Sequence, residues 1–124
     1  MRSDYDLVKE FHEKFEIDIG ETPHIPTGQV LAFRLELIDE ELKELFESIE
    51  NNDLENFAQE LADVLYVVNG FAVTAGIDVH KILEEVHRSN MTKLDENGKV
   101  NKRADGKVLK GPNYQKPNIK KVLK

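Results

Sequence analysis

The stretch from Leu61 to Ala75 constrains the fold most, because only Asp63, Asn69 and Thr74 in it are overtly polar. Its period is helical, and a helix that is apolar nearly all round must be covered on every side. A chain of 124 residues offers few neighbours for that purpose. The pattern therefore predicts a central helix whose remaining cover comes from a second subunit, in a homodimer or a higher homo-oligomer.

Three other segments also have helical periodicity, and turn residues separate them. The predicted helices cover residues 4–16, 27–50, 54–75 and 78–93. Thr27 and Asp78 are expected to cap the second and fourth helices, and Gly76 is expected to end the third. The turn Asn51–Asp53 is short, so the helices on either side of it should be antiparallel neighbours. The sequence thus predicts an all-α, antiparallel bundle of about four helices.

The composition changes after Lys93. The turn signals at residues 96–99 and 104–107 contain Asn-Gly and Asp-Gly pairs, which favour a small hairpin. Pro117 could begin a last helical turn. We therefore expect residues 1–93 to form the helical bundle, and residues 94–124 to form a short extended arm packed on the same domain.

The charge is divided between these two parts. Residues 1–85 hold 6 Lys/Arg and 21 Asp/Glu, a balance of −15, whereas residues 86–124 hold 11 Lys/Arg and 3 acids, a balance of +8. A solvated basic tail on an acidic body would give the same division. The functional interpretation is that the carboxylates bind metal ions while the basic arm meets phosphates.

Several classes of protein are excluded by what the sequence lacks. There are no cysteines, so disulfides, zinc–thiolate sites and thiol nucleophiles are excluded. The chain has no apolar segment typical of a signal peptide, and its apolar run is shorter than the ~20 residues of a membrane span. The acidic body opposes binding to a nucleic-acid backbone. We expect a cytoplasmic protein with no membrane partner and no nucleic-acid partner.

Two pairs of acids have a spacing that predicts a metal site. Glu41 and Glu44 lie on the second predicted helix, and Glu60 and Asp63 lie on the third, each pair at i, i+3 and so on one side of its helix. The second pair shares its face with apolar residues, where an unpaired carboxylate is costly. Antiparallel helices can bring the two pairs face to face. Four oxygen ligands suit Mg²⁺, with Mn²⁺ as an alternative.

These acids also carry a resemblance to a known family. The segment Glu40-Glu41-Leu42-Lys43-Glu44, followed after 15 residues by Glu60-Leu61-Ala62-Asp63, resembles the EExxE…ExxD signature of the all-α nucleoside triphosphate pyrophosphohydrolases, the MazG-like superfamily. Arg34, the segment 61–67, the segment His87–Lys93 and the segment Ala104–Lys107 extend the resemblance. This longer set is similar to the dUTPase-like branch and covers roughly residues 30–115.

The resemblance implies an oligomeric helical bundle in which Glu41, Glu44, Glu60 and Asp63 bind Mg²⁺. Glu40 would orient or deprotonate the water that attacks the α-phosphorus of a nucleoside triphosphate, releasing the monophosphate and pyrophosphate. A dNTP such as dUTP is the expected substrate. The residues expected to bind it are Arg34, Asn90, Lys93, Lys107, Lys110 and Tyr114, although a packing role for Tyr114 is equally open.

Three alternatives remain beside this interpretation. A phosphoribosyl-ATP pyrophosphohydrolase uses a related acidic bundle, and a non-catalytic nucleotide-binding module could share the fold. A di-iron carboxylate protein is suggested by the Glu-x-x-His motif at Glu84–His87, but such proteins need this motif on two helices. The presence of all five motif acids favours the enzyme.

Overall fold

The computed structural model describes residues 1–94 and 97–123. Glu96, in the first turn signal, and Lys124 lie outside the described residues. The helices are α1 (Asp4–Lys14), α2 (Gly28–Glu50), α3 (Leu54–Thr74), α4 (Val79–Met91) and the short α5 (Ile119–Val122). No strand is formed within the described ranges, so the prediction of an all-α fold is confirmed. Contacts divide the chain into two units, residues 1–79 and 80–124.

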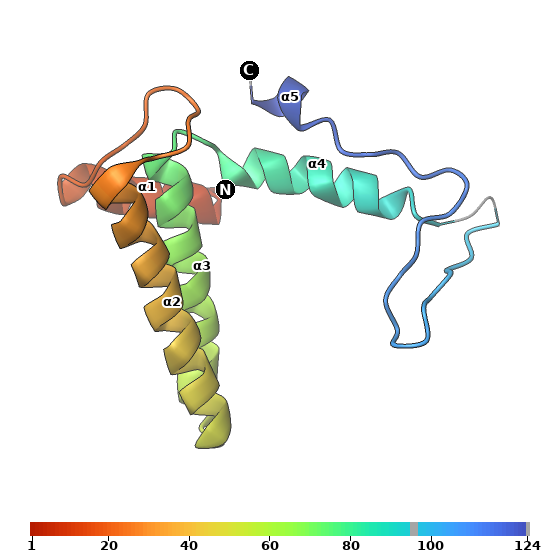
Figure 1. Cartoon of the computed structure of the whole chain (residues 1–124), viewed down its shortest axis with the longest axis horizontal. Helices are drawn as coiled ribbons and strands as arrows, with labels where there is room; N and C mark the ends of the chain where they lie inside the picture. Colours follow the sequence, from red (N-terminus) through yellow and green to blue (C-terminus); the bar gives the residue numbers. More distant parts are fainter. Residues whose placement is uncertain (95–96, 124) are drawn as a thin grey trace. The chain divides into compact units, whose positions relative to one another are not determined.

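The first unit is built on an antiparallel hairpin of α2 and α3 (Figure 1). The predicted short turn joins them, and α1 packs against α3. Tyr5 and Val8 of α1 and Val73 of α3 form the buried apolar cluster. This small core lies between α1 and the C-terminal part of α3, so the remaining length of the α2–α3 hairpin is free to carry polar side chains in its seam.

The helix boundaries lie within two residues of the predicted ones, but the cap expected at the start of α2 does not form its hydrogen bond. Thr27 occupies the N-cap position, but its side chain makes no capping hydrogen bond. Gly28, the first residue of the helix, has a left-handed φ of +61°, which is not the geometry that follows a capping hydroxyl. Thr27 therefore occupies the predicted N-cap position, but the prediction that its side chain caps the helix is wrong. Gly76, with a φ of +70°, follows α3 as predicted.

The connection between α1 and α2 is fixed to the end of α3. The Gly20 N–H donates to the Val73 carbonyl at 2.9 Å, and the His24 N–H donates to the Ala75 carbonyl at 2.9 Å. A Cβ atom on Gly20 would lie 2.5 Å from the backbone nitrogen of Gly76, so this contact requires a glycine. The connection thereby holds residues 16–18 beside the start of α2.

A single chain does not cover α3 on all sides. Leu61, Leu65 and Tyr66 are exposed by 45%, 55% and 42%. On α2, Phe46 is exposed by 61%. The apolar surface that the sequence indicated is therefore real in one chain, while its cover by a second subunit stays a prediction.

The second unit contains α4, the basic arm and α5. An isolated antiparallel bridge joins Lys102 and Val108, and the Leu109 N–H donates to the Asn101 carbonyl at 2.7 Å. The hairpin expected around the Asp-Gly turn is therefore present in minimal form. The last helix begins at Ile119 rather than at Pro117, because the Asn118 side chain caps it by accepting from the Lys121 N–H.

Within the described residues, no single helix is both long enough and apolar enough to cross a membrane. The pair α3 and α4 meets the length and hydropathy criteria for a membrane span only when the two helices are joined, and they are bent by 110° at the break between them.

Candidate functional site

Three carboxylates converge between α2 and α3. One oxygen each from Glu41, Glu60 and Asp63 can be chosen so that all three lie within 4.8 Å of one another. Glu60 is only 5% exposed, and Glu41 and Asp63 are half-buried. The antiparallel hairpin brings them together because the i, i+3 acids of α3 face the acidic edge of α2. The convergence that the spacing predicted for these three residues is present.

Two oxygens in this cluster are buried without a partner. Among the described residues no hydrogen bond reaches Oε2 of Glu41 or Oε2 of Glu60. A buried unpaired carboxylate oxygen is costly unless a cation or donor meets it. Burial, followed by the neighbouring carboxyl groups, raises the pKa of Glu41 to about 7. Burial is also the main cause that raises the pKa of Glu60.

The donor set fits a hard divalent cation. Carboxylate oxygens in a close group are the ligands that Mg²⁺ and Mn²⁺ prefer, and the two unpartnered oxygens provide free lone pairs for such an ion. Glu44 is exposed and lies outside the convergent group, although its negative charge contributes to the raised pKa values of Glu41 and Glu60. The residues present therefore fit one ion at Glu41, Glu60 and Asp63, with Glu44 at the edge.

Glu40 and Arg34 lie on the same helix as Glu41 but in different surroundings. Glu40 is exposed to solvent, where it is free to meet a water molecule. Arg34 is buried, with 6% of its surface exposed, and lies two helical turns before Glu41. Glu84 and His87 of the Glu-x-x-His motif do not belong to the convergent group of ligands found among the described residues.

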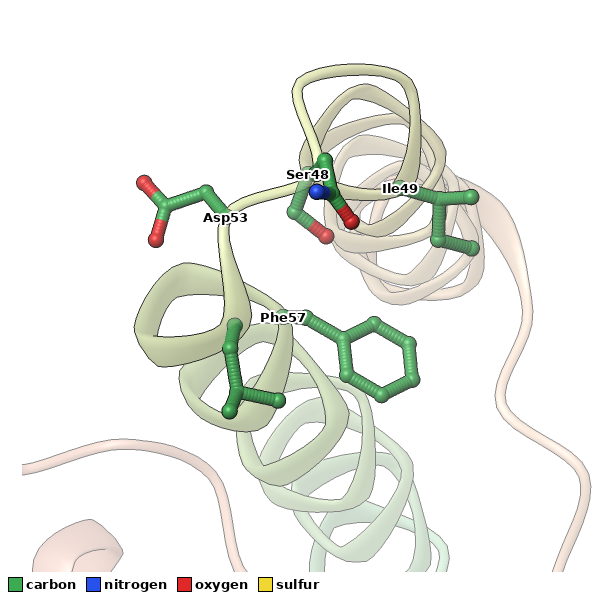
Figure 2. A pocket seen from close by; sticks show the side chains of 6 residues that line it. Ser48, Ile49, Asp53 and Phe57 are labelled. Carbon is green, nitrogen blue, oxygen red and sulfur yellow. The ribbon is translucent and has the colours of Figure 1, made fainter.

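A shallow apolar hollow lies near the turn between α2 and α3. Its volume is about 230 Å³, and it is lined by Ser48, Ile49, Asn52, Asp53, Leu54 and Phe57. Figure 2 shows Ile49 and Phe57 reaching from the two helices toward this hollow, whereas the Asp53 carboxylate points away. The Asp53 carboxylate accepts from the Asn56 N–H at 3.1 Å and so caps α3. The hollow therefore offers apolar surface but few free polar groups.

The metal-free protein should become less stable as the pH rises from about 4.5 to about 7. The folded pKa of Glu41 is raised from 4.5 to about 7, so the folded state binds this proton more tightly than the unfolded state over that range. Glu41→Gln should remove this contribution. In EDTA, the melting temperature of the variant should rise relative to that of the wild type between pH 5 and pH 7.5.

Glu47→Gln, on the same helix and exposed, is the matched control. If the difference in melting temperature between the wild type and Glu41→Gln stays constant across this pH range, the folded state does not raise the pKa of Glu41.

The other residues expected to bind substrate lie in the second unit. Asn90 is exposed at the end of α4, and Lys93 is half-buried one turn later, its N–H donating to the Asn90 carbonyl at 3.1 Å. Lys107 is exposed, and the Lys110 ammonium lies 4.7 Å from the centre of the Tyr114 ring. Their approach to the acids of the first unit stays a prediction.

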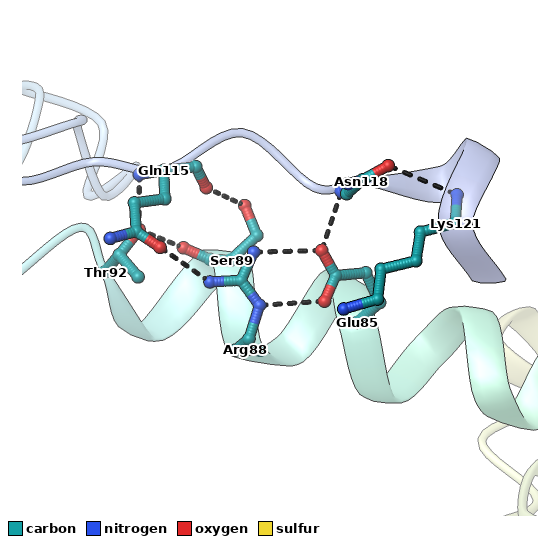
Figure 3. A network of polar contacts seen from close by, with 7 residues as sticks. All are labelled: Glu85, Arg88, Ser89, Thr92, Gln115, Asn118 and Lys121. Atoms are coloured by element: carbon teal, nitrogen blue, oxygen red, sulfur yellow. Dashed lines mark hydrogen bonds and ion pairs between the residues drawn. The ribbon is translucent and has the colours of Figure 1, made fainter.

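A polar network that the sequence analysis missed closes the base of the arm (Figure 3). Arg88 pairs with both oxygens of Glu85, at 2.8 and 2.9 Å, and donates to the Gln115 side chain at 2.9 Å. Ser89 donates to the Gln115 carbonyl at 2.7 Å, and the Gln115 N–H donates to the Thr92 hydroxyl at 2.8 Å. We name these five residues the arm clamp.

The arm clamp explains why the basic segment is not a free tail. Glu85 also accepts from the Asn118 N–H at 2.6 Å, and its bonds to Arg88 and Asn118 lower its pKa to about 2. The chain therefore leaves α4 near Thr92 and is fixed to it again at Gln115 and Asn118. A signal was present in the sequence, because Glu85, Ser89 and Thr92 share one face at i, i+4 and i+7.

Ser89→Ala should loosen the arm without disturbing the first unit. The hydroxyl of this buried serine is the donor to Gln115, so its loss leaves the carbonyl to compete for water. Amide hydrogen exchange at Gln115 and Asn118 should become faster, while exchange in α2 and α3 should not change. Thr92→Ser, which keeps its hydroxyl, is the control; equal protection in wild type and Ser89→Ala would show that the clamp does not hold the arm.

Comparison with known proteins agrees with the acidic hairpin. Over 76 residues the chain is 37% identical to an uncharacterized protein of Acanthamoeba polyphaga mimivirus; the match covers 60% of this chain and 30% of that protein. The chain thus spans less than a third of the length of the curated relative it matches. Residues 8–90, which include α2, α3 and all five motif acids, match the family described as phosphoribosyl-ATP pyrophosphohydrolase. The chain therefore belongs to this family of all-α pyrophosphohydrolases.

Proposed function

We propose that this protein is a Mg²⁺-dependent nucleoside triphosphate pyrophosphohydrolase that acts on a dNTP such as dUTP. The observation that carries the proposal is the group of three carboxylates with two buried oxygens that lack a partner. Membership of a pyrophosphohydrolase family supports the reaction type. The dUTPase-like branch rests on the motif resemblance around Asn90 and Lys93.

The roles of the residues follow from their surroundings. Glu41, Glu60 and Asp63, with Glu44 at the edge, would hold the ion. When bound, Mg²⁺ neutralises phosphate charge and lowers the pKa of a coordinated water. Glu40 is exposed beside this group, and we assign it the task of orienting the attacking water and accepting its proton.

The reaction forms one bond and breaks one. The water oxygen attacks the α-phosphorus, and the bond from that phosphorus to the bridging oxygen breaks, so the monophosphate and pyrophosphate separate. Lys93, Lys107 and Lys110 supply positive charge to the phosphates, and Asn90 supplies an amide donor. Cationic side chains are needed because carboxylates already offset much of the charge of the ion.

Two other functions remain to be distinguished from this one. The family match favours phosphoribosyl-ATP as substrate about as well as it favours a dNTP. A non-catalytic nucleotide-binding module would share the fold, but it would not need all five motif acids. A cytoplasmic location is proposed on the composition alone, which includes no cysteine.

The deciding experiment is a panel of substrates with Mg²⁺ and with EDTA. The panel contains the nucleoside triphosphates and diphosphates and phosphoribosyl-ATP, and the assay scores release of pyrophosphate separately from release of phosphate. Metal-dependent pyrophosphate release from a dNTP is the expected result. Turnover of phosphoribosyl-ATP alone would select the first alternative, and binding without turnover would select the second.

We also propose that the protein is a homodimer or a higher homo-oligomer. The exposed apolar residues of α3, such as Leu65 at 55%, are costly in water and need cover. Sedimentation at micromolar concentration should therefore show at least twice the mass of one chain, 14.2 kDa. A monomer at that concentration would contradict this proposal and would leave the apolar surface of α3 without explanation.

A further inference from the structure

Arg34 is a buried cation that forms no ion pair with another described residue. It is 6% exposed, and among residues 1–94 and 97–123 no ion pair or hydrogen bond is found for its guanidinium. The guanidinium carbon lies 5.5 Å from the centre of the Phe33 ring, which is a cation–π contact. Arginine remains protonated in proteins, so burying it without an acceptor is expensive. Arg34 is therefore suited to donate hydrogen bonds to a ligand.

The neighbours of Arg34 hold it in place. A Cβ atom on Gly70 would lie 3.0 Å from Nη1 of Arg34 and 3.3 Å from Nε2 of His12. Gly70 thus leaves the space through which the arginine crosses α3. His12 is 2% exposed, and its Nδ1 pairs with the Asp18 carbonyl at 3.0 Å. Since a carbonyl can only accept, Nδ1 carries the proton of this bond. The guanidinium is therefore held by packing, while the charge of Asp18 acts on it without forming an ion pair.

Arg34 lies on the wall of a cavity of about 360 Å³, which has the chemistry of a binding pocket. Phe33, 51% exposed, and Val30 provide apolar surface, and Asp18 and Glu16 bring acidic groups to the same wall. Two acids beside one arginine disfavour a phosphate, which is strongly negative. They favour a neutral, planar ligand that offers a carbonyl to Arg34 and an N–H to a carboxylate.

We propose that this cavity binds the base of the nucleotide and selects a base with a ring lactam, a carbonyl beside an N–H. Uracil, thymine and guanine have this edge; adenine has no carbonyl. Arg34 donates to the carbonyl, Asp18 accepts from the ring N–H, and Phe33 stacks on the ring. The inference rests on the proposed function, which it deepens by naming the class of base. It favours a dNTP such as dUTP over phosphoribosyl-ATP, whose base is adenine.

The position of the cavity agrees with this assignment. Arg34 and Glu41 are seven residues apart on α2, and Gly70 and Asp63 are seven residues apart on α3. Seven residues are nearly two helical turns, so each pair lies on one face, with a rise of about 10.5 Å. The cavity and the acids therefore lie along the same seam of the hairpin. A nucleotide bound by its base at Arg34 can direct its phosphates toward Glu41.

The hollow at Phe57 is the competing location for a base. It also lies near the acids, since Phe57 is one turn from Glu60. Its one charged lining residue, Asp53, is already used as the cap of α3. That hollow can bury an apolar ring, and the Asn52 amide can meet one edge of a base, but its lining includes no cation to pair with a base carbonyl. The polar groups needed for selection are at Arg34.

The test measures base preference and metal-free binding separately. The kcat/KM values for dUTP, dGTP and dATP are compared with Mg²⁺, and NMR titration in EDTA compares uridine, guanosine and adenosine. We expect at least a tenfold preference for a lactam base over adenine in both assays. Arg34→Met should reduce that preference about tenfold. Asp18→Ala, at an exposed position, should reduce it too and tests the inference if Arg34→Met does not fold.

Arg2→Met, which removes an exposed arginine of the same unit, is the control and should keep the preference. Equal use of adenine, a preference for adenine, or a lactam preference unchanged in Arg34→Met and Asp18→Ala would overturn the inference. Selective binding of uridine or guanosine without turnover of any triphosphate would uphold the base site and refute the proposed reaction. The two failures are therefore distinguishable.

Discussion

Asp63→Asn should abolish turnover while leaving the helical fold intact. Asp63 is one of the three converging carboxylates, and the substitution removes a negative charge at nearly constant shape. Changing a residue that only supports a metal ligand already costs 10–100-fold, so loss of a ligand should lower kcat about a hundredfold or more. Initial rates at limiting Mg²⁺ measure the effect, and far-ultraviolet circular dichroism verifies the helices.

The control for this variant is Glu47→Gln, which removes an exposed acid from α2. It should keep the wild-type rate and the wild-type dependence on Mg²⁺. Wild-type activity of Asp63→Asn at limiting Mg²⁺ would show that the converging acids are not the metal site. An Mg²⁺ requirement shifted to higher concentration, with part of the rate regained, would agree with weakened metal binding.

Lys93→Ala should lower kcat/KM about ten- to a hundredfold, which corresponds to the loss of one charge-assisted contact of about 1.5–3 kcal/mol. A triphosphate carries about four negative charges, more than one ion held by carboxylates can offset. Lys93 is half-buried two residues after the end of α4, next to the arm clamp, so its side chain is less free than those of the exposed lysines. Steady-state kinetics with the best triphosphate substrate measure the effect.

Lys120→Ala is the matched control, because it removes one exposed lysine from α5 in the same unit. Its kcat/KM should be close to that of the wild type. If the two variants have equal and negligible effects, the lysines of the basic arm are solvated surface charges and do not bind phosphate. Rescue by Lys93→Arg, which keeps the charge, would separate a role of charge from a role of shape.

The helices and the acid cluster could be predicted because both depend on local periodicity. The spacing of Glu60 and Asp63 within an apolar stretch was sufficient to place them on an inner face, and the short turn at Asn51 fixed the antiparallel partner. Glu44 was grouped with them by the same spacing. Its exposure could not be predicted, since the i, i+3 spacing does not determine how far each acid of α2 turns toward α3.

The buried environment of Arg34 and the arm clamp could not be derived in the same way. Both depend on contacts between residues far apart in sequence, such as Arg34 with Gly70 and Ser89 with Gln115. A polar stripe on α4 shows that something polar must cover it, but it does not say which segment. The change of charge after residue 85 suggested that the arm binds phosphate. It gave no information on which residues fix the arm to α4.

The closed base of the arm makes its tip a place for engineering. Residues 103–107 form the turn of the minimal hairpin, where Gly106 has a φ of +92° and Asp105 is exposed. Because the ends of the loop are fixed by the arm clamp, added chain at the tip need not pull on α4. Doubling the length of a flexible loop costs only about 0.6 kcal/mol in closure entropy. A fluorescent reporter inserted between Asp105 and Gly106 would therefore leave the rest of the second unit folded.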